Sequence, residues 1–202
     1  MLMTFNQRLL CCVLGSLVLV IAAFDLFKAE PLVVRAEGER ITIEFYPTGE
    51  SEKVNPVALS FSGKVYENLV LPDSPEKSNL TEDEAFLAKA IAINKSGTLE
   101  DVLSLWSPSE RPGIRKVAED PKIFEANQKF YGAIEKSSLK AKILYGTYTI
   151  YIVKHSGASG EILKDYPVKK VEGKYFLTNA LKEDPVFQYL TTKYIKKLRE
   201  LK

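Results

Sequence analysis

The stretch from Leu139 to His155, LKAKILYGTYTIYIVKH, decides the fold class, because it is the longest run of strand-forming residues in the chain. Isoleucine, valine, threonine and tyrosine make up more than half of it, and these residues favour a pleated, half-buried strand. A glycine inside a strand often marks a bulge or a bend. We therefore predict one long strand here, bent at Gly146.

Two shorter strands follow this one. Residues 157–160 form a turn into a strand over 161–170, and Glu172-Gly173 turns that strand into a last one over 174–178. The spacing predicts three strands of an antiparallel sheet, joined in the order in which they occur.

A small β-unit precedes the helices. Residues 31–46 alternate between apolar and polar on both sides of Glu37-Gly38, which predicts a hairpin, and residues 57–66 form a second extended stretch. Residues 71–78, LPDSPEKS, predict a linker. Two or three strands bury too little apolar surface to be stable alone, so we do not expect residues 31–70 to fold by themselves.

The helical pattern begins at Thr81. Thr81 and Glu84 have the spacing of a capping box, and the acidic run 82–84 is explained by the favourable position of negative charge in a helix's first turn. A second capping pattern at 98–101 predicts a short helix that contains Trp106, and Pro112-Gly113 predicts a turn.

Two more helices are predicted towards the C-terminus. Asp120-Pro121 begins the first, with proline at the first helical position. Asp184-Pro185 begins the second, an amphipathic helix whose apolar positions recur at steps of three and four. Its basic residues allow two interpretations: contact with anionic lipid headgroups or an acidic partner, or a solvated face with cations near the helix C-terminus. These residues are Lys193, Lys196, Lys197, Arg199 and Lys202.

The N-terminal segment indicates export. Residues 9–24 contain no charge, Arg8 precedes them and Asp25 follows them. A short apolar core with a positive flank is typical of a signal peptide, whereas a membrane span needs about 20 apolar residues. A cleaved signal peptide within 1–28 and a retained anchor at 9–27 both fit. Either way we expect the rest of the chain to be periplasmic or otherwise extracytoplasmic.

Charge and cysteine content exclude several functions. The 28 lysines and arginines against 26 aspartates and glutamates give a net charge of +2, so we expect no nucleic acid partner. Cys11 and Cys12 lie in the apolar segment, so no disulfide, zinc-thiolate site or cysteine nucleophile can form beyond residue 12. We predict no cofactor, no metal ligand and no catalytic residue.

His155 is the only histidine, so any histidine-dependent chemistry must use it. It precedes Ser156 and Gly157 at the end of the long strand, and we interpret it as a surface turn residue.

An aromatic ligand pocket is the remaining candidate site. Strand alternation places Tyr145 and Tyr151 on one face and Tyr148 on the other. Trp106 and Tyr131 from the helices complete the candidate lining, although tyrosine is common in strands and Trp106 also fits the core.

Three stretches resemble the nuclear transport factor 2-like superfamily, which includes ketosteroid isomerase. They are Phe86–Asn94, the segment LEDVLSLWSP at 99–108, and VEGKYFLT at 171–178. The chain is most similar to exported bacterial domains of unknown function in that superfamily, over roughly 81–180. The resemblance implies a cone of helices packed on a curved antiparallel sheet. Catalytic members carry acidic, tyrosine or histidine side chains inside the cone, and no residue-by-residue match to them is present here.

The predicted fold is therefore α+β. It comprises a signal or anchor over 1–28, a β-hairpin unit and linker over 29–78, and a cone-shaped domain with a C-terminal amphipathic helix over 79–202.

The expected function is non-enzymatic binding of a partner protein or a small apolar ligand. The alternatives are a cone-fold isomerase or hydrolase that uses a buried carboxylate and a tyrosine, and a structural subunit of a cell-envelope complex. A homodimer is compatible with the sequence, which does not define the oligomeric state.

Overall fold

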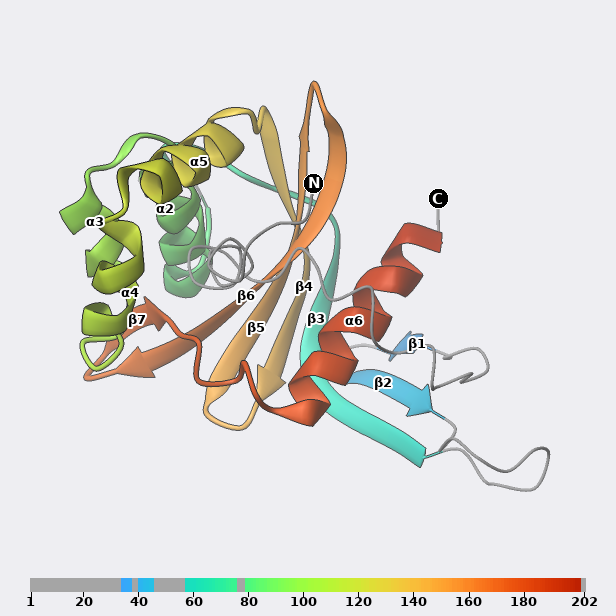
Figure 1. Ribbon diagram of the computed structural model, residues 1–202. Coiled ribbons are helices and arrows are strands. Elements are labelled where there is room, and N and C mark those ends of the chain that lie inside the picture. The colour runs from blue at the N-terminus through green and yellow to red at the C-terminus, as the bar shows by residue number, and fades with distance from the viewer. Residues whose placement is uncertain (1–33, 38–39, 46–56, 76–78, 201–202) are drawn as a thin grey trace, which may run out of the picture.

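The computed structural model describes residues 34–37, 40–45, 57–75 and 79–200. Its strands are β1 (Val34–Glu37), β2 (Arg40–Phe45), β3 (Val57–Leu71), β4 (Lys136–Tyr145), β5 (Tyr148–Gly157), β6 (Gly160–Val171) and β7 (Lys174–Leu177). Its helices are α2 (Glu82–Ser96), α3 (Leu99–Ser104), α4 (Arg111–Ala118), α5 (Pro121–Gly132) and α6 (Pro185–Glu200). The predicted α+β class is confirmed: the helices pack on a curved antiparallel sheet (Figure 1).

The seven described strands form one sheet in chain order, and each neighbouring pair is antiparallel. β1 and β2 form the predicted hairpin, with Glu37 opposite Arg40. β3, 15 residues long, pairs with β2 along its first part and with β4 along its second. The strands ahead of the helices therefore belong to the same sheet as those behind them, and α2 to α5 are one excursion between β3 and β4.

The prediction of one long strand over Leu139–His155 is wrong. The chain reverses at residues 146 and 147, so that Tyr145 of β4 pairs with Tyr148 of β5. Gly146 has a φ of 58°, which glycine adopts without steric cost and which the first position of a tight hairpin turn of type II′ requires. The glycine marks a turn between two strands, and the sheet has one strand more than the three predicted for this region.

A bulge in β4 decides which residues face which side of the sheet. The pairing with β5 shifts between Leu139 and Ala141, leaving Lys140 as the extra residue. Leu139 consequently packs towards α2 to α5, whereas Ala141 and Ile143 pack towards α6. Simple alternation would have placed all three on one face.

The predicted starts of three helices are confirmed. The N–H of Thr81 donates to Glu84 Oε2 at 3.0 Å ahead of α2, and the N–H of Thr98 donates to Asp101 at 2.9 Å ahead of α3. Asp120 accepts a backbone N–H at 3.0 Å at the start of α5. These bonds satisfy amide groups that the first turn of a helix leaves without intrahelical partners.

The prediction of a turn at Pro112-Gly113 is wrong, because both residues lie in the first turn of α4. The ring of a proline does not disturb a helix at this position, since the missing N–H is one that would have no intrahelical partner.

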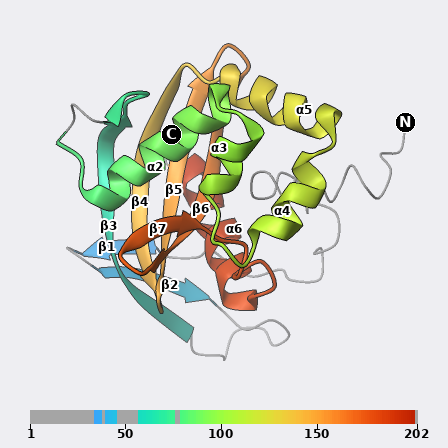
Figure 2. The ribbon, with the colours of Figure 1, turned by 90° about the vertical axis from the view of Figure 1, so that its left-hand side faces the viewer.

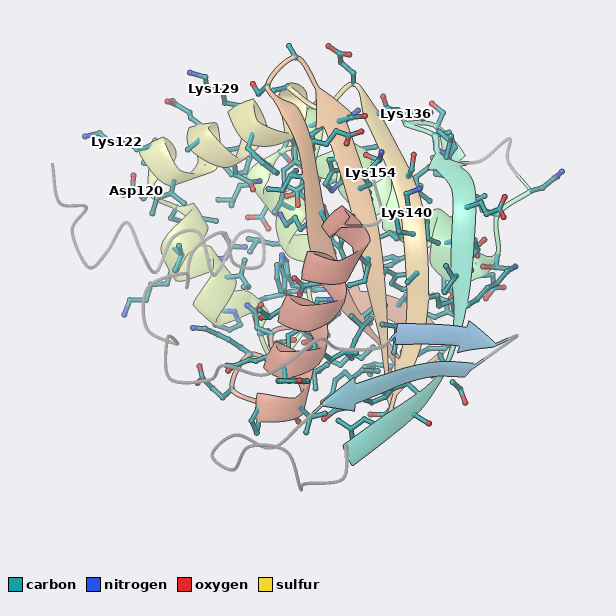
Figure 3. The ribbon with its side chains drawn as sticks, turned by 90° about the vertical axis from the view of Figure 1, so that its right-hand side faces the viewer. Asp120, Lys122, Lys129, Lys136, Lys140 and Lys154 are labelled. Atoms are coloured by element: carbon teal, nitrogen blue, oxygen red, sulfur yellow. The ribbon has the colours of Figure 1, made fainter. Side chains whose placement is uncertain are left out.

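The helices cover both faces of the sheet. Figure 2 shows α2 to α5 in front of the sheet, and Figure 3 shows α6 crossing the opposite face. We call these the multi-helix face and the α6 face. The core of the multi-helix face includes Leu87, Ile91, Leu103, Trp106, Tyr131, Leu139, Tyr151, Val153, Tyr166 and Val168. The core of the α6 face comprises Ala141, Ile143, Ile150, Ile152, Leu181, Phe187 and Leu190.

The start of α6 is fixed to the sheet by one carboxylate. Asp184 accepts the N–H of Phe187 at 2.8 Å, as its predicted capping role requires, and the hydroxyl of Tyr145 donates to the same carboxylate at 2.9 Å. The β4–β5 turn therefore sets where α6 begins.

The predicted signal or anchor over 1–28 lies outside the described residues. Of the helices that are described, none combines the length and the apolarity needed to cross a membrane.

The end of α5 packs against β5 too closely for a side chain at Gly157. A Cβ there would lie 2.2 Å from the carbonyl oxygen of Ala133, which ends α5. We expect Gly157→Ala to lower the free energy of unfolding by about 1–3 kcal/mol, because backbone must move to admit the methyl group. Urea denaturation followed by circular dichroism measures this.

Gly113→Ala is the matched control for this substitution. Nothing lies within 4 Å of the position a Cβ would take, and the residue is helical. Its stability should be unchanged or raised by up to about 1 kcal/mol. Equal stabilities of the two variants would contradict the close approach at Gly157.

Candidate functional site

The sheet separates the five residues predicted to line a ligand pocket. Trp106, Tyr131 and Tyr151 belong to the core of the multi-helix face, where they are 6%, 1% and 0% exposed. Tyr145 and Tyr148 pack against the core of the α6 face. The structure brings the first three together and places the other two on the opposite side.

The prediction that Tyr145 and Tyr151 share a face is wrong. Because the chain turns back between them, Tyr145 lies opposite Tyr148 in the ladder, and directly paired residues share a face. Tyr148 and Tyr151 are three residues apart on β5 and therefore face opposite sides.

A polar site that the sequence did not reveal lies where the first turn of α2 meets the multi-helix face. Asp83 and Glu84 are 8% and 6% exposed, although both are acidic residues at a helix start. The helix-dipole explanation of these residues is therefore incomplete, since it favours negative charge at a helix start but does not account for the burial of two carboxylates there.

Asp83 is held by one lysine and one tyrosine from neighbouring strands. Its Oδ2 forms an ion pair with Lys142 of β4 and accepts a hydrogen bond from the hydroxyl of Tyr151 of β5. Its Oδ1 accepts a bond from Thr81 Oγ1 at 2.6 Å. The ammonium of Lys142 also lies 6.0 Å from the centre of the Tyr151 ring.

Glu84 uses its two oxygens for two tasks. Oε2 accepts the N–H of Thr81, while Oε1 accepts the hydroxyl of Tyr66 of β3 at 2.7 Å. Lys64, two residues before Tyr66 on the same strand, places its ammonium 4.9 Å from the centre of that tyrosine ring. Residues two apart on a strand share a face, which places Lys64 beside the tyrosine that bonds Glu84.

Glu82 completes the pattern at the solvent-exposed end. Lys170 of β6 lies 3.9 Å from Glu82 Oε2 and donates to the hydroxyl of Tyr175 of β7 at 3.2 Å. The side chain of Glu82 is 84% exposed and that of Lys170 is 48% exposed. Such an exposed pair contributes little to stability.

Three consecutive acidic residues thus each contact the sheet: Asp83 contacts a lysine and a tyrosine, Glu82 contacts a lysine that bonds a tyrosine, and Glu84 contacts a tyrosine that lies beside a lysine. We call this set the acidic-turn cluster: Glu82 with Lys170 and Tyr175, Asp83 with Lys142 and Tyr151, and Glu84 with Lys64 and Tyr66. It connects the first turn of α2 to five strands, β3 to β7.

The electrostatics of the cluster favour an ionised Asp83. Burial raises the pKa of Asp83, but its bonds to Lys142, Thr81 and Tyr151 outweigh that effect and lower the pKa to about 2. Burial, and then the hydrogen bond to a carboxylate, raise the pKa of the Tyr151 and Tyr66 hydroxyls above the usual range. At neutral pH the tyrosines therefore donate and the carboxylate accepts.

The ion pair and hydrogen bonds of Asp83 hold it firmly to Lys142 and Tyr151, but they make it poorly suited to proton transfer. A general base or acid works best when its pKa lies near the operating pH, and the shifts of Asp83 and Tyr151 run away from neutrality. We conclude that these two residues fix α2 to the sheet.

His155 is not the predicted surface turn residue. It is 1% exposed, and its Nδ1 lies 2.9 Å from Ser137 Oγ while its Nε2 lies 2.7 Å from the hydroxyl of Tyr166. Burial, and then the nearby Lys164 and Lys95, lower the pKa of His155 to about 3. The end of β5 is covered by α5, and this tertiary contact buries a residue that its local sequence places at a turn.

Asp165 is the buried carboxyl on the α6 face. It is 8% exposed, and burial raises its pKa. It pairs with Ile152 in the β5–β6 ladder, so the sheet separates it from Tyr131 and Tyr151.

One feature of the sequence could have revealed the acidic-turn cluster. Lys64-Val65-Tyr66 has the spacing of two that places a lysine and a tyrosine on one face of a strand. The other two pairs each combine residues from two strands, so only the strand pairing brings their members together.

No family model, no curated protein and no solved structure matches the chain. Within the described ranges, no three histidine, cysteine, aspartate or glutamate side chains are grouped so that they could hold a metal ion.

Replacing Asp83 by asparagine tests the role of the acidic-turn cluster. At pH 7 we expect Asp83→Asn to lower the free energy of unfolding by about 1–3 kcal/mol, because it removes the charge that Lys142 and Tyr151 are arranged to meet. Glu82→Gln, at the 84% exposed position, should change stability by less than about 0.5 kcal/mol.

The contribution of Asp83 to the free energy of unfolding should decrease at low pH. The pKa of Asp83 in the folded state, about 2, lies below the ordinary value of 3.8, so its ionised form stabilises the fold above about pH 4. That contribution is lost as the pH falls towards 2, and the difference between wild type and Asp83→Asn should shrink over the same interval. Urea denaturation at pH 7, 4 and 2.5 measures it, and a constant difference would contradict the assignment.

Proposed function

We propose that this chain is a non-enzymatic domain, exported or membrane-anchored, that binds a partner protein. The observation that carries the proposal is the packing of aromatic side chains into the space between the helices and the sheet. Trp106, Tyr131 and Tyr151 fill this space together with Leu87 and Leu103, and all five are at most 6% exposed.

This packing favours a protein over a small apolar ligand as the partner. A small-molecule site is a cavity of several hundred cubic ångströms lined by apolar side chains. Here Trp106, Tyr131 and Tyr151, the predicted lining of such a cavity, are buried in one core with helix residues, and Tyr131 also forms a T-shaped pair with Phe130 with centres 5.1 Å apart. A partner would therefore bind to the outer surface of the domain.

The polar residues support the same proposal. Asp83 is ionised and committed to Lys142, Thr81 and Tyr151, so it resembles a structural ion pair more than a poised acid or base.

We also propose a location and a family for this chain. The apolar segment 9–27 supports export or anchoring. We propose nuclear transport factor 2-like ancestry and a cone shape for roughly 81–180, supported by a helical layer packed on one face of a curved antiparallel sheet. In that arrangement the strands ahead of residue 72 and α6 are additions to the common core.

A second candidate function is an isomerase or hydrolase, and Asp165 favours it. Burial raises the pKa of this carboxyl, which is the direction that acid–base catalysis at neutral pH requires. Its site would lie on the α6 face, away from Tyr131, Tyr151 and Tyr166.

Native mass spectrometry of the full-length product, recovered from its own cells in mild detergent, tests the proposal. We expect the chain to carry the additional mass of a polypeptide that dissociates intact on activation. The mass of the chain itself reports whether the apolar segment has been removed, so location and binding are measured separately.

Three other outcomes would contradict partner binding. A retained small molecule would favour the second candidate or a ligand-binding domain. A large assembly of fixed stoichiometry would favour a structural subunit of an envelope complex, and the chain alone after gentle extraction would leave the proposed partner without support. A sample washed in high salt is the control for adventitious polypeptides, because weak contacts between exposed charges are screened there.

A further inference from the structure

A second buried polar cluster joins α5 to three strands. A chain of hydrogen bonds runs from Lys164 Nζ to Tyr131 at 2.7 Å, then to Tyr166 at 3.2 Å, to His155 Nε2 at 2.7 Å, and from Nδ1 to Ser137 at 2.9 Å. All five residues are at most 6% exposed. We call them the histidine cluster. Tyr131 is the member that α5 contributes, so the chain connects this helix to β4, β5 and β6.

Lys164 determines which group donates and which accepts in each hydrogen bond of the chain. An ammonium can only donate, so Tyr131 accepts from Lys164 and its own hydroxyl proton is free to go to Tyr166. Tyr166 then donates to Nε2 of His155, which leaves the imidazole proton on Nδ1 and directed at Ser137. The reverse direction would leave the proton of the 1% exposed Tyr131 without an acceptor in this chain of bonds. Ser137 therefore accepts from His155, and the pair is not arranged as a nucleophile and its base.

The cluster contains two basic groups and no carboxylate. Lys164 is 6% exposed and lies 4.6–5.4 Å from the centres of the Phe130, Tyr131 and Tyr166 rings, and none of the described carboxylates forms an ion pair with it. Aromatic faces and a phenol oxygen stabilise its charge, and Asp165 on the opposite face of the sheet interacts with it through space.

The groups around His155 on the packed elements can all be named. Ser137 of β4 is uncharged, β6 presents Tyr166 and Lys164, and α5 presents the Tyr131 ring, centred 6.2 Å away. From α2, Lys95 adds a further positive charge through space, and Lys95 is itself paired with Asp73 at 2.6 Å.

We propose that the histidine cluster is an acid-sensitive latch that holds α5 on the sheet while His155 is neutral and releases it when His155 gains a proton. A protonated Nε2 becomes a donor and can no longer accept from Tyr166. The hydroxyl protons of Tyr166 and Tyr131 then no longer each have an acceptor along the chain. The new imidazolium also lies beside the ammonium of Lys164, whereas the carboxylate of Asp165, which interacts with Lys164 through space, lies on the opposite face of the sheet. Lifting α5 lets water reach both charges.

The two clusters respond to acid at different pH. The closed cluster resists protonation, with the pKa of His155 lowered to about 3, whereas an exposed histidine has a pKa of about 6.5. Opening is therefore favoured progressively as the pH falls below about 6.5. Asp83 stays ionised down to a pKa of about 2, so α2 keeps its bonds to the sheet at a pH where α5 is released.

Hydrogen exchange of the untagged full-length chain tests this order of events. Linkage to a single histidine predicts that the opening constant of the α5 amides, residues 121–132, rises about 30-fold between pH 8 and pH 5, once intrinsic exchange rates are accounted for. At both pH values the opening constant of the α5 amides should exceed that of the α2 amides, residues 82–96, because global unfolding also exposes His155 and is linked to the same proton. Equal opening constants in α5 and α2 would mean that α5 opens only by global unfolding, and no rise in α5 would mean no latch; either result would overturn the proposal.

The single histidine allows a direct second measurement. With one imidazole in the chain, its ¹⁵N resonances report the tautomer and the protonation of His155 without overlap. We expect the Nδ1–H tautomer at pH 7 and no titration of the closed form above pH 5. An imidazole that titrates near 6.5 while α5 stays protected would overturn the proposal.

Three variants separate the latch from general acid sensitivity. His155→Gln should abolish the 30-fold rise, and Lys164→Met should raise the pH at which the closed-state imidazole titrates. Lys154→Met is the matched control: Lys154, labelled in Figure 3, lies next to His155 on β5 but faces the α6 side and pairs with Glu161 at 2.7 Å. It should behave as wild type. If His155→Gln does not fold, the imidazole titration in Lys164→Met decides, and a titration unchanged from wild type would overturn the proposal.

Discussion

The fold depends on how the sheet binds three acidic side chains at the start of α2. Glu82, Asp83 and Glu84 begin the helical segment between β3 and β4. Asp83 contacts Lys142 and Tyr151, Glu82 contacts Lys170, and Glu84 contacts Tyr66. Burying a carboxylate without a partner is costly, so Asp83 and Glu84 restrict where α2 can lie. Once that turn is placed, Leu87 and Ile91 on the next turns enter the core, and the other helices pack around them.

On the same face of the sheet, the histidine cluster attaches α5 by a different kind of interaction. Tyr151 belongs to the acidic-turn cluster and His155, four residues later on β5, to the histidine cluster. The first holds α2 through opposite charges, while the second holds α5 through a hydrogen-bond chain that runs from Lys164 to a neutral imidazole. Charge pairing persists while the carboxylate is ionised, whereas the neutral chain requires an unprotonated imidazole. The two helices therefore differ in their sensitivity to acid although they share one core.

These interactions also bear on function. The buried tyrosines and the tryptophan fill the interior and hold the helices, which favours an outer surface as the place of recognition. Asp165 is the exception, since its burial on the α6 face keeps an acid–base function open as the second candidate.

The sequence by itself determined the α+β class, the β1–β2 hairpin, the antiparallel chain-order joining of the last strands, the starts of α2, α3 and α5, and the capping of α6 by Asp184. These features depend on residues close together in the chain. The reversal at Gly146, the bulge at Lys140 and the burial of His155 were decided only by tertiary structure. A glycine can bend, bulge or reverse a strand, and which of these occurs depends on the strand it pairs with. The lysine–tyrosine pairs at Asp83 and Glu82 likewise join residues from separate strands, so they exist only once the register of the sheet is set.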